Sequence, residues 1–325
     1  MQTGIRDCNR RNISLPAIAH CHRFHQGLCG FAVEDCLVLI VLALPFVTCV
    51  GCITAEEALL AQGEDLLSRQ EYEAASLLFT RYIQLCPDAP RGYFARGIAN
   101  RELGILQDAE EDFAKAILLN PNNTNFRWAR FEILQRRYKT LQSSATTTFD
   151  RPVWETLMSA LSTLMMQDLE EILRVDPGDV SARLEYASLL SLRGSLEEAM
   201  TELDRSVLEA PFDVGVRNER GRLLHEMGRY TDAIKDYDVA LRYCDTCTLV
   251  KYNRALSLKK CGRIEEAVAA FQEVVAEDSL DGGAWLNLGE LLHMIGRRDD
   301  ACVSLHTSMT LGNPEARDLY EELCR

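Results

Sequence analysis

The chain has 325 residues, of which 47% are hydrophobic and 7% are aromatic, a composition typical of a folded protein. Its formal net charge is −14 at pH 7. Because nucleic-acid binding requires clustered Lys and Arg side chains that neutralise phosphates, this acidity argues against a general role in binding nucleic acid.

Residues 1–53 differ in character from the rest of the chain. Their charged side chains are four arginines and three acids (Arg6, Arg10, Arg11, Arg23, Asp7, Glu34, Asp35), a net charge of about +1, so the remaining chain carries about −15. We expect residues 1–35 to be a disordered leader, because they lack the regular apolar pattern of a folded element.

Residues 36–53 are apolar and contain no charged side chain, a length close to that needed to cross a bilayer. We predict a transmembrane or signal anchor, because a cleaved signal peptide has its apolar core nearer the start of the chain. The arginines before the segment place the N-terminus in the cytoplasm and the rest of the chain across the membrane. The predicted location is therefore the membrane or the secretory pathway. There are two alternatives. The segment could be a helix that packs on the first repeat and is interrupted by Pro45, or a leader that lies outside the fold. In either case the protein would be cytoplasmic.

From residue 56 onward a pattern recurs every 34 residues, and four copies abut at 180–213, 214–247, 248–281 and 282–315. The eighth position is small in Gly63, Gly97, Ala187, Gly221, Ala255 and Gly289. In the six regular copies the twentieth position is alanine, in Ala75, Ala109, Ala199, Ala233, Ala267 and Ala301. The twenty-fourth is large, in Phe79, Phe113, Leu203, Tyr237, Phe271 and Leu305. This period predicts stacked helix pairs, with small residues where the two helices of a pair cross and the large residue between neighbouring repeats.

Glycine and proline mark the ends of these predicted helices. Gly104, Gly194, Gly228, Gly262 and Gly296 share the fifteenth position, where the first helix should end in a left-handed turn. Pro87, Pro121, Pro177 and Pro211 should each follow the end of a second helix. The fold class predicted from the residues is all-α.

These features resemble the tetratricopeptide repeat family, whose consensus is close to the segment from Trp285 to Gly289 followed by Ala301. The resemblance covers 56–315 and implies a right-handed superhelical solenoid of helix–turn–helix repeats. We expect repeats 1 and 2 at 56–123, an atypical repeat 3 at 124–179, repeats 4–7 at 180–315 and a capping helix at 314–325.

Repeat 3 breaks the period because it is about 22 residues too long. Phe131 and Met165 replace the small crossing residues, and the polar run at 142–150 predicts an exposed loop between two separated helices. Positive charge is concentrated on the predicted first helix, in Arg127, Arg130, Arg136, Arg137 and Lys139. We consider two interpretations of these residues. They could form a basic patch that binds acidic partners or anionic lipid. Alternatively, their side chains could extend to solvent from positions between helices, as we expect for Arg217 and Arg220.

The resemblance also implies that first helices line a concave groove that binds a protein or peptide. The candidate binding residues are Asn218, Arg222, His225, Tyr252, Asn253, Lys260, Asn287, Glu290 and His293. Asn253 and Asn287 share the sixth position, where an amide can both donate to and accept from a peptide backbone. The clamp with which some family members hold chaperone tails is not matched, because Gly283 and Asn287 replace its basic pair.

Cysteines do not predict a site. Cys244 and Cys247 have redox or zinc spacing, but a zinc site needs about four ligands, and we expect ordinary cysteines at a junction between repeats.

The sequence contains no phosphate loop, nucleophile elbow or paired metal motif, so we expect no enzyme activity, no cofactor and no metal. We predict a membrane-tethered interaction scaffold. The alternatives are a soluble intracellular scaffold that resembles a co-chaperone, and a lumenal or periplasmic assembly factor.

Overall fold

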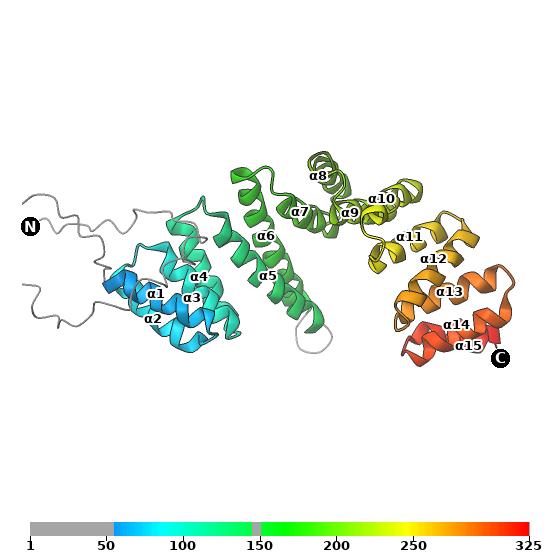
Figure 1. Cartoon of the computed structure of the whole chain (residues 1–325), viewed down its shortest axis with the longest axis horizontal. Coiled ribbons are helices and arrows are strands. Elements are labelled where there is room, and N and C mark those ends of the chain that lie inside the picture. The colour runs from blue at the N-terminus through cyan, green and yellow to red at the C-terminus, as the bar shows by residue number, and fades with distance from the viewer. Residues whose placement is uncertain (1–54, 145–150, 325) are drawn as a thin grey trace, which may run out of the picture. The chain divides into compact units, whose positions relative to one another are not determined.

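The computed structural model describes residues 55–144 and 151–324, and within these ranges the protein is all-α, with fifteen helices and no strand. The chain divides after Arg137 into two compact units, which are described separately. Figure 1 shows the helices in chain order. The apolar segment 36–53 lies outside the described ranges, and no helix within them is long and apolar enough to cross a membrane.

The first unit contains two helix pairs and the first part of a fifth helix. The pairs are α1 (Ala55–Ser68) with α2 (Tyr72–Leu85) and α3 (Pro90–Glu102) with α4 (Leu106–Leu119), followed by α5 (Thr124–Ser144). The predicted loop at 142–150 is wrong in part, since α5 continues through Ser144; residues 145–150 are not described.

The second unit begins within α5 and continues with α6 (Arg151–Val175). Four regular helix pairs follow: α7 (Val180–Leu192) with α8 (Leu196–Glu209), α9 (Val214–Glu226) with α10 (Tyr230–Tyr243), α11 (Thr248–Lys260) with α12 (Ile264–Glu277), and α13 (Gly282–Met294) with α14 (Arg298–Thr310). A last helix, α15 (Pro314–Cys324), packs against α14. The first helices of these pairs begin 34 residues apart, at Val180, Val214, Thr248 and Gly282, as the sequence period requires.

The eighth position of a repeat lies against the large side chain at its twenty-fourth position. An added Cβ at Gly221 would lie 2.6 Å from the Tyr237 ring, and one at Gly97 would lie 2.6 Å from the Phe113 ring. Both rings are fully buried. The sequence predicts this large side chain between neighbouring repeats. It also fills the crossing inside its own repeat, so a small eighth residue and a large twenty-fourth residue form one packing unit.

The helix ends follow the predicted chemistry. All five glycines at the fifteenth position have φ between 76° and 83°, a left-handed conformation that glycine adopts without steric cost. In repeats 4, 5 and 7 an aspartate stands before the first helix, and its carboxylate accepts a hydrogen bond from the third N–H of that helix. These caps are Asp179, Asp213 and Asp281, with 2.9 Å bonds to Ala182, Val216 and Ala284. Each carboxylate satisfies one of the unpaired amides at the helix start.

Two disulfides lie in the second unit, and the first contradicts the expectation that Cys244 and Cys247 are ordinary cysteines. Cys244 is bonded to Cys247 between α10 and α11, and Cys302 of α14 is bonded to Cys324 of α15. The close approach of the second pair could not be foreseen, because it depends on how α15 folds back against α14. The apolar side of α15 packs against α14 and the last repeat, and it consists of Ala316, Leu319, Tyr320 and Leu323.

Candidate functional site

Polar side chains connect the first helices of repeats 4 to 7. Ser191 of α7 donates to Glu226 of α9 at 2.8 Å. Asn253 of α11 donates to Asn218 of α9 at 3.0 Å, and Asn287 of α13 donates to the Tyr252 hydroxyl of α11 at 3.4 Å. We call this row of side chains on α7, α9, α11 and α13 the first-helix face. It brings predicted binding residues from three repeats together.

The charged groups of this face are largely neutralised by one another. Arg222 binds Glu219 at 3.0 Å and Glu226 at 3.5 Å, and Lys259 pairs with Glu290 and donates to Asn287 at 2.7 Å. Lys259 was not among the predicted binding residues, although it shares the twelfth position with two of them, His225 and His293. The contacts of Lys259 are made with side chains of the next repeat, and its repeat position alone does not predict those contacts.

His225 and Tyr252 are held by neighbours on both sides. The Nδ1 atom of His225 lies 2.8 Å from the Ser257 hydroxyl, and its ring packs edge-on against Tyr230. Burial, aided by the positive charge of Lys260, lowers the pKa of His225 below its usual value. The Tyr252 ring packs edge-on against Phe271, and burial raises the pKa of the Tyr252 hydroxyl. Both side chains are therefore fixed and neutral near pH 7.

Three predicted residues retain unused binding capacity. The amide oxygen of Asn253 accepts no hydrogen bond from any residue that the structure describes, and Lys260 and His293 are exposed, with no ion pair to a described side chain. Asn287 differs, since its amide group also donates to the Gly283 carbonyl at 2.9 Å. Of the two asparagines at the sixth position, Asn253 is thus the one available to a ligand.

Glu185, at the sixth position of repeat 4, extends the same row on α7. Burial raises the pKa of its carboxyl group, Lys139 of α5 lowers it, and the carboxylate of Glu219 raises it again. The row of sixth positions therefore changes from carboxylates in repeats 4 and 5 to amides in repeats 6 and 7.

Two cavities lie away from this face. They have volumes of about 360 Å³ and 310 Å³ and are lined by α8, α9 and α10 and by α6, α7 and α8, respectively. No predicted groove residue lines either one. The larger cavity contains Asp236, which is only 2% exposed and pairs with Arg217 and Arg220 at 2.7 Å. Its charges are already used within the fold, so we assign it no ligand.

The predicted basic patch is only partly a surface. Arg127 is buried, and it donates to the Pro121 carbonyl at 3.4 Å, just as Arg217 donates to the Pro211 carbonyl at 2.8 Å. Arg137 pairs with Glu110, and Arg130 is partly buried. Arg136 and Lys139 are exposed. The positions of Arg127 and Arg137 favour the alternative in which these arginines act within the fold.

Residues 90–123 and 252–302 each match a family model of the tetratricopeptide repeat. The helix pairs and their 34-residue spacing agree with these matches. The chain therefore contains tetratricopeptide repeats. Such repeats are scaffolds for protein–protein interaction and are generally not enzymes.

Solved structures share this fold at low sequence identity. A tetratricopeptide repeat protein from Parabacteroides merdae is 16% identical, with a TM-score of 0.56, and the match covers 83% of this chain and 99% of that one. The Cut9–Hcn1 hetero-tetramer of APC/C contains a chain that is 14% identical, with a TM-score of 0.55; the match covers 83% of this repeat protein and 49% of that chain. No curated protein sequence matches the chain. At this identity the likeness concerns the fold alone.

Proposed function

We propose that this repeat protein is a non-enzymatic adaptor that binds an extended segment of a protein partner along the first-helix face of repeats 4–7. The observation that carries the proposal is the hydrogen-bonded row across α7, α9, α11 and α13. It holds polar groups from successive repeats in fixed positions, which lowers the entropy lost when a ligand binds. The open oxygen of Asn253 can accept a backbone N–H of the partner, and the exposed ammonium of Lys260 can pair with a carboxylate.

Affinity capture with the full chain tests this surface. We expect Asn253→Ala combined with Lys260→Ala to reduce recovery of the specific partners about tenfold, because two hydrogen-bonding groups are lost. The matched control combines Lys235→Ala with Glu273→Ala, since both residues are exposed on second helices and should not affect capture. Equal recovery by the Asn253/Lys260 variant and the control, with both folded, would rule out this face as the binding surface.

Asn287→Ala separates binding from local structure. Its side chain is hydrogen-bonded to Gly283, Tyr252 and Lys259, so the substitution should lower the stability of repeats 6 and 7. Asn253→Ala should mainly weaken capture. Quantitative capture and thermal unfolding of both variants measure the two effects. If Asn287→Ala weakened capture and Asn253→Ala mainly lowered stability, the ligand would bind Asn287 instead.

We also propose that residues 36–53 tether the adaptor to a membrane or direct it to the secretory pathway. The disulfide between Cys302 and Cys324 supports this location, because such bonds persist in oxidising compartments. Membrane fractionation of the chain with and without residues 1–53 tests the tether, and protease protection in sealed membranes tests the side. A soluble full-length chain in fractionation would instead support an intracellular scaffold.

A further inference from the structure

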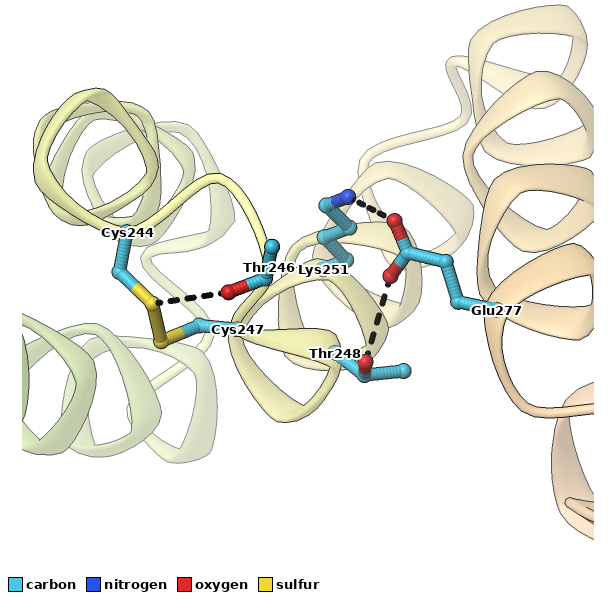
Figure 2. The surroundings of a disulfide bond; sticks show 6 residues. All are labelled: Cys244, Thr246, Cys247, Thr248, Lys251 and Glu277. Carbon is cyan, nitrogen blue, oxygen red and sulfur yellow. Dashed lines mark hydrogen bonds and ion pairs between the residues drawn. A yellow bond between two sulfur atoms is a disulfide. The ribbon is translucent and has the colours of Figure 1, made fainter.

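The disulfide between Cys244 and Cys247 lies at a junction between two helices. Cys244 directly follows the last residue of α10, and Cys247 directly precedes the first residue of α11. Figure 2 shows the Thr246 hydroxyl directed at the Cys244 sulfur, 4.0 Å away. Both cysteines are partly exposed. The bond is therefore accessible to a thiol from solution or from a bound protein.

Cys247 occupies the position that an anion occupies in the other regular repeats of this unit. Before α7, α9 and α13 this position is aspartate, and its carboxylate accepts the third N–H of the helix. In the disulfide form, the side chain of Cys247 makes no capping hydrogen bond. The corresponding amide, that of Val250, donates to the Cys247 backbone carbonyl at 3.0 Å instead. A thiolate at Cys247 would lie at the positive end of the helix dipole, and it could accept the Val250 amide in place of the backbone carbonyl, as the aspartates accept the corresponding amides.

Lys251 does not account for this environment, because its charge is already paired. Figure 2 shows Lys251 paired with Glu277, whose other oxygen accepts the Thr248 hydroxyl at 3.2 Å. Asp245, inside the disulfide ring, is exposed, so solvent screens its repulsion. The start of α11 is therefore the feature that favours a negative sulfur, and it favours Cys247 over Cys244.

We propose that Cys244 and Cys247 form a redox-active pair that exchanges with a dithiol of a protein, with Cys247 as the sulfur that forms the mixed disulfide. The thiolate of the substrate attacks the Sγ of Cys247, the bond between the two cysteines breaks, and its electron pair moves to Cys244, which takes up a proton near the Thr246 hydroxyl. The second thiolate of the substrate then attacks the substrate sulfur of the mixed disulfide and releases Cys247 as a thiolate. The substrate is oxidised to a disulfide, and the cysteine pair is reduced by two electrons.

The disulfide between Cys302 and Cys324 is an internal control. It joins two helices over 22 residues of separation, and Cys302 lies within α14 while Cys324 ends α15. Neither cysteine precedes a helix start, so neither thiolate gains the stabilisation available to Cys247. We therefore expect a dithiol to exchange with the disulfide between Cys244 and Cys247 and not with the one between Cys302 and Cys324.

Single cysteine variants of the full chain test which sulfur reacts. The chain with Cys244→Ser retains Cys247, and the chain with Cys247→Ser retains Cys244. With oxidised glutathione near pH 7, we expect the mixed disulfide at Cys247 to form about tenfold faster than that at Cys244, because its thiolate is stabilised. Peptide mapping by mass spectrometry distinguishes these sites from the other thiols of the chain, and Cys261 serves as a partly exposed reference. Equal rates at Cys247, Cys244 and Cys261 would overturn the proposal.

A single-turnover reaction tests the exchange itself. The oxidised full chain is mixed with a reduced peptide that contains two cysteines, and formation of the peptide disulfide is followed. We expect one equivalent of oxidised peptide from the wild type, the same yield from Cys302→Ser combined with Cys324→Ser, and less than a tenth of it from Cys244→Ser combined with Cys247→Ser. Equal loss of the two disulfides during the reaction, or no peptide oxidation, would show that the pair is only structural.

Discussion

Gln70 has a φ of 63°, at the same repeat position where five other repeats place a left-handed glycine. A residue with a Cβ is strained in this conformation. We predict that Gln70→Gly raises the free energy of unfolding by about 1 kcal/mol, since glycine removes this strain. The matched control is Gly104→Ala, which should lower it by a similar amount. Urea unfolding measures both, and a less stable Gln70→Gly variant would contradict the interpretation.

His225 is a second residue whose behaviour follows from its surroundings. Because burial and Lys260 lower its pKa in the folded state, the unfolded chain binds a proton more readily than the folded chain. The contribution of His225 to stability is therefore complete above the ordinary histidine pKa of about 6.5 and is lost as the pH falls below it.

We predict that the stability difference between wild type and His225→Gln shifts against the wild type as the pH falls from about 8 to about 5. Unfolding experiments at several pH values measure this difference. Lys260→Gln is the control, because removing the positive charge should reduce the pH dependence without abolishing it. A difference that does not change with pH would show that burial of His225 has no effect on its protonation.

At the scale of the helix pair, stability depends on the fit between the eighth and twenty-fourth positions. Gly221→Ala would place a Cβ against the buried Tyr237 ring. We predict a loss of about 2 kcal/mol, because the overpacking exceeds the gain from replacing glycine in a helix.

Repeat 4 provides the compensating change, since it combines Ala187 with Leu203 at the same positions. Adding Tyr237→Leu to Gly221→Ala should recover part of the loss, and a double-mutant cycle of unfolding free energies measures the coupling. Additive effects of the two substitutions would mean that the two positions do not form one packing unit.

At the scale of the whole molecule, the disulfide between Cys302 and Cys324 secures the last helix of the second unit. Arg298 of α14 also donates to the Leu323 carbonyl at 3.0 Å. Because each repeat contacts mainly its neighbours, the loss of this link should have a local effect. We predict that Cys302→Ser combined with Cys324→Ser removes up to about 3 kcal/mol of local stability.

Hydrogen exchange measures this effect helix by helix. Amides of α15 should lose protection, those of α14 should lose less, and those of α9 and α10 should remain unchanged. Uniform loss across the unit would instead show that it unfolds as one cooperative body.

The sequence by itself determined the helix pairs, their spacing and their ends. The recurrence of Gly, Ala and Pro reports local backbone and crossing requirements, which are the same in every repeat. The positions that face neighbouring repeats could also be counted, which identified Asn253 and Lys260 as candidates for binding.

Only the tertiary structure decided which polar groups remain open and which cysteines are joined. Asn253 and Asn287 share one repeat position, yet Lys259 engages the amide oxygen of Asn287 while that of Asn253 stays free of described donors. Cys244 and Cys247 form a bond where the sequence indicated ordinary cysteines. These outcomes depend on distances between side chains of different helices, and a periodic pattern specifies the positions of residues but not the partners that their side chains find.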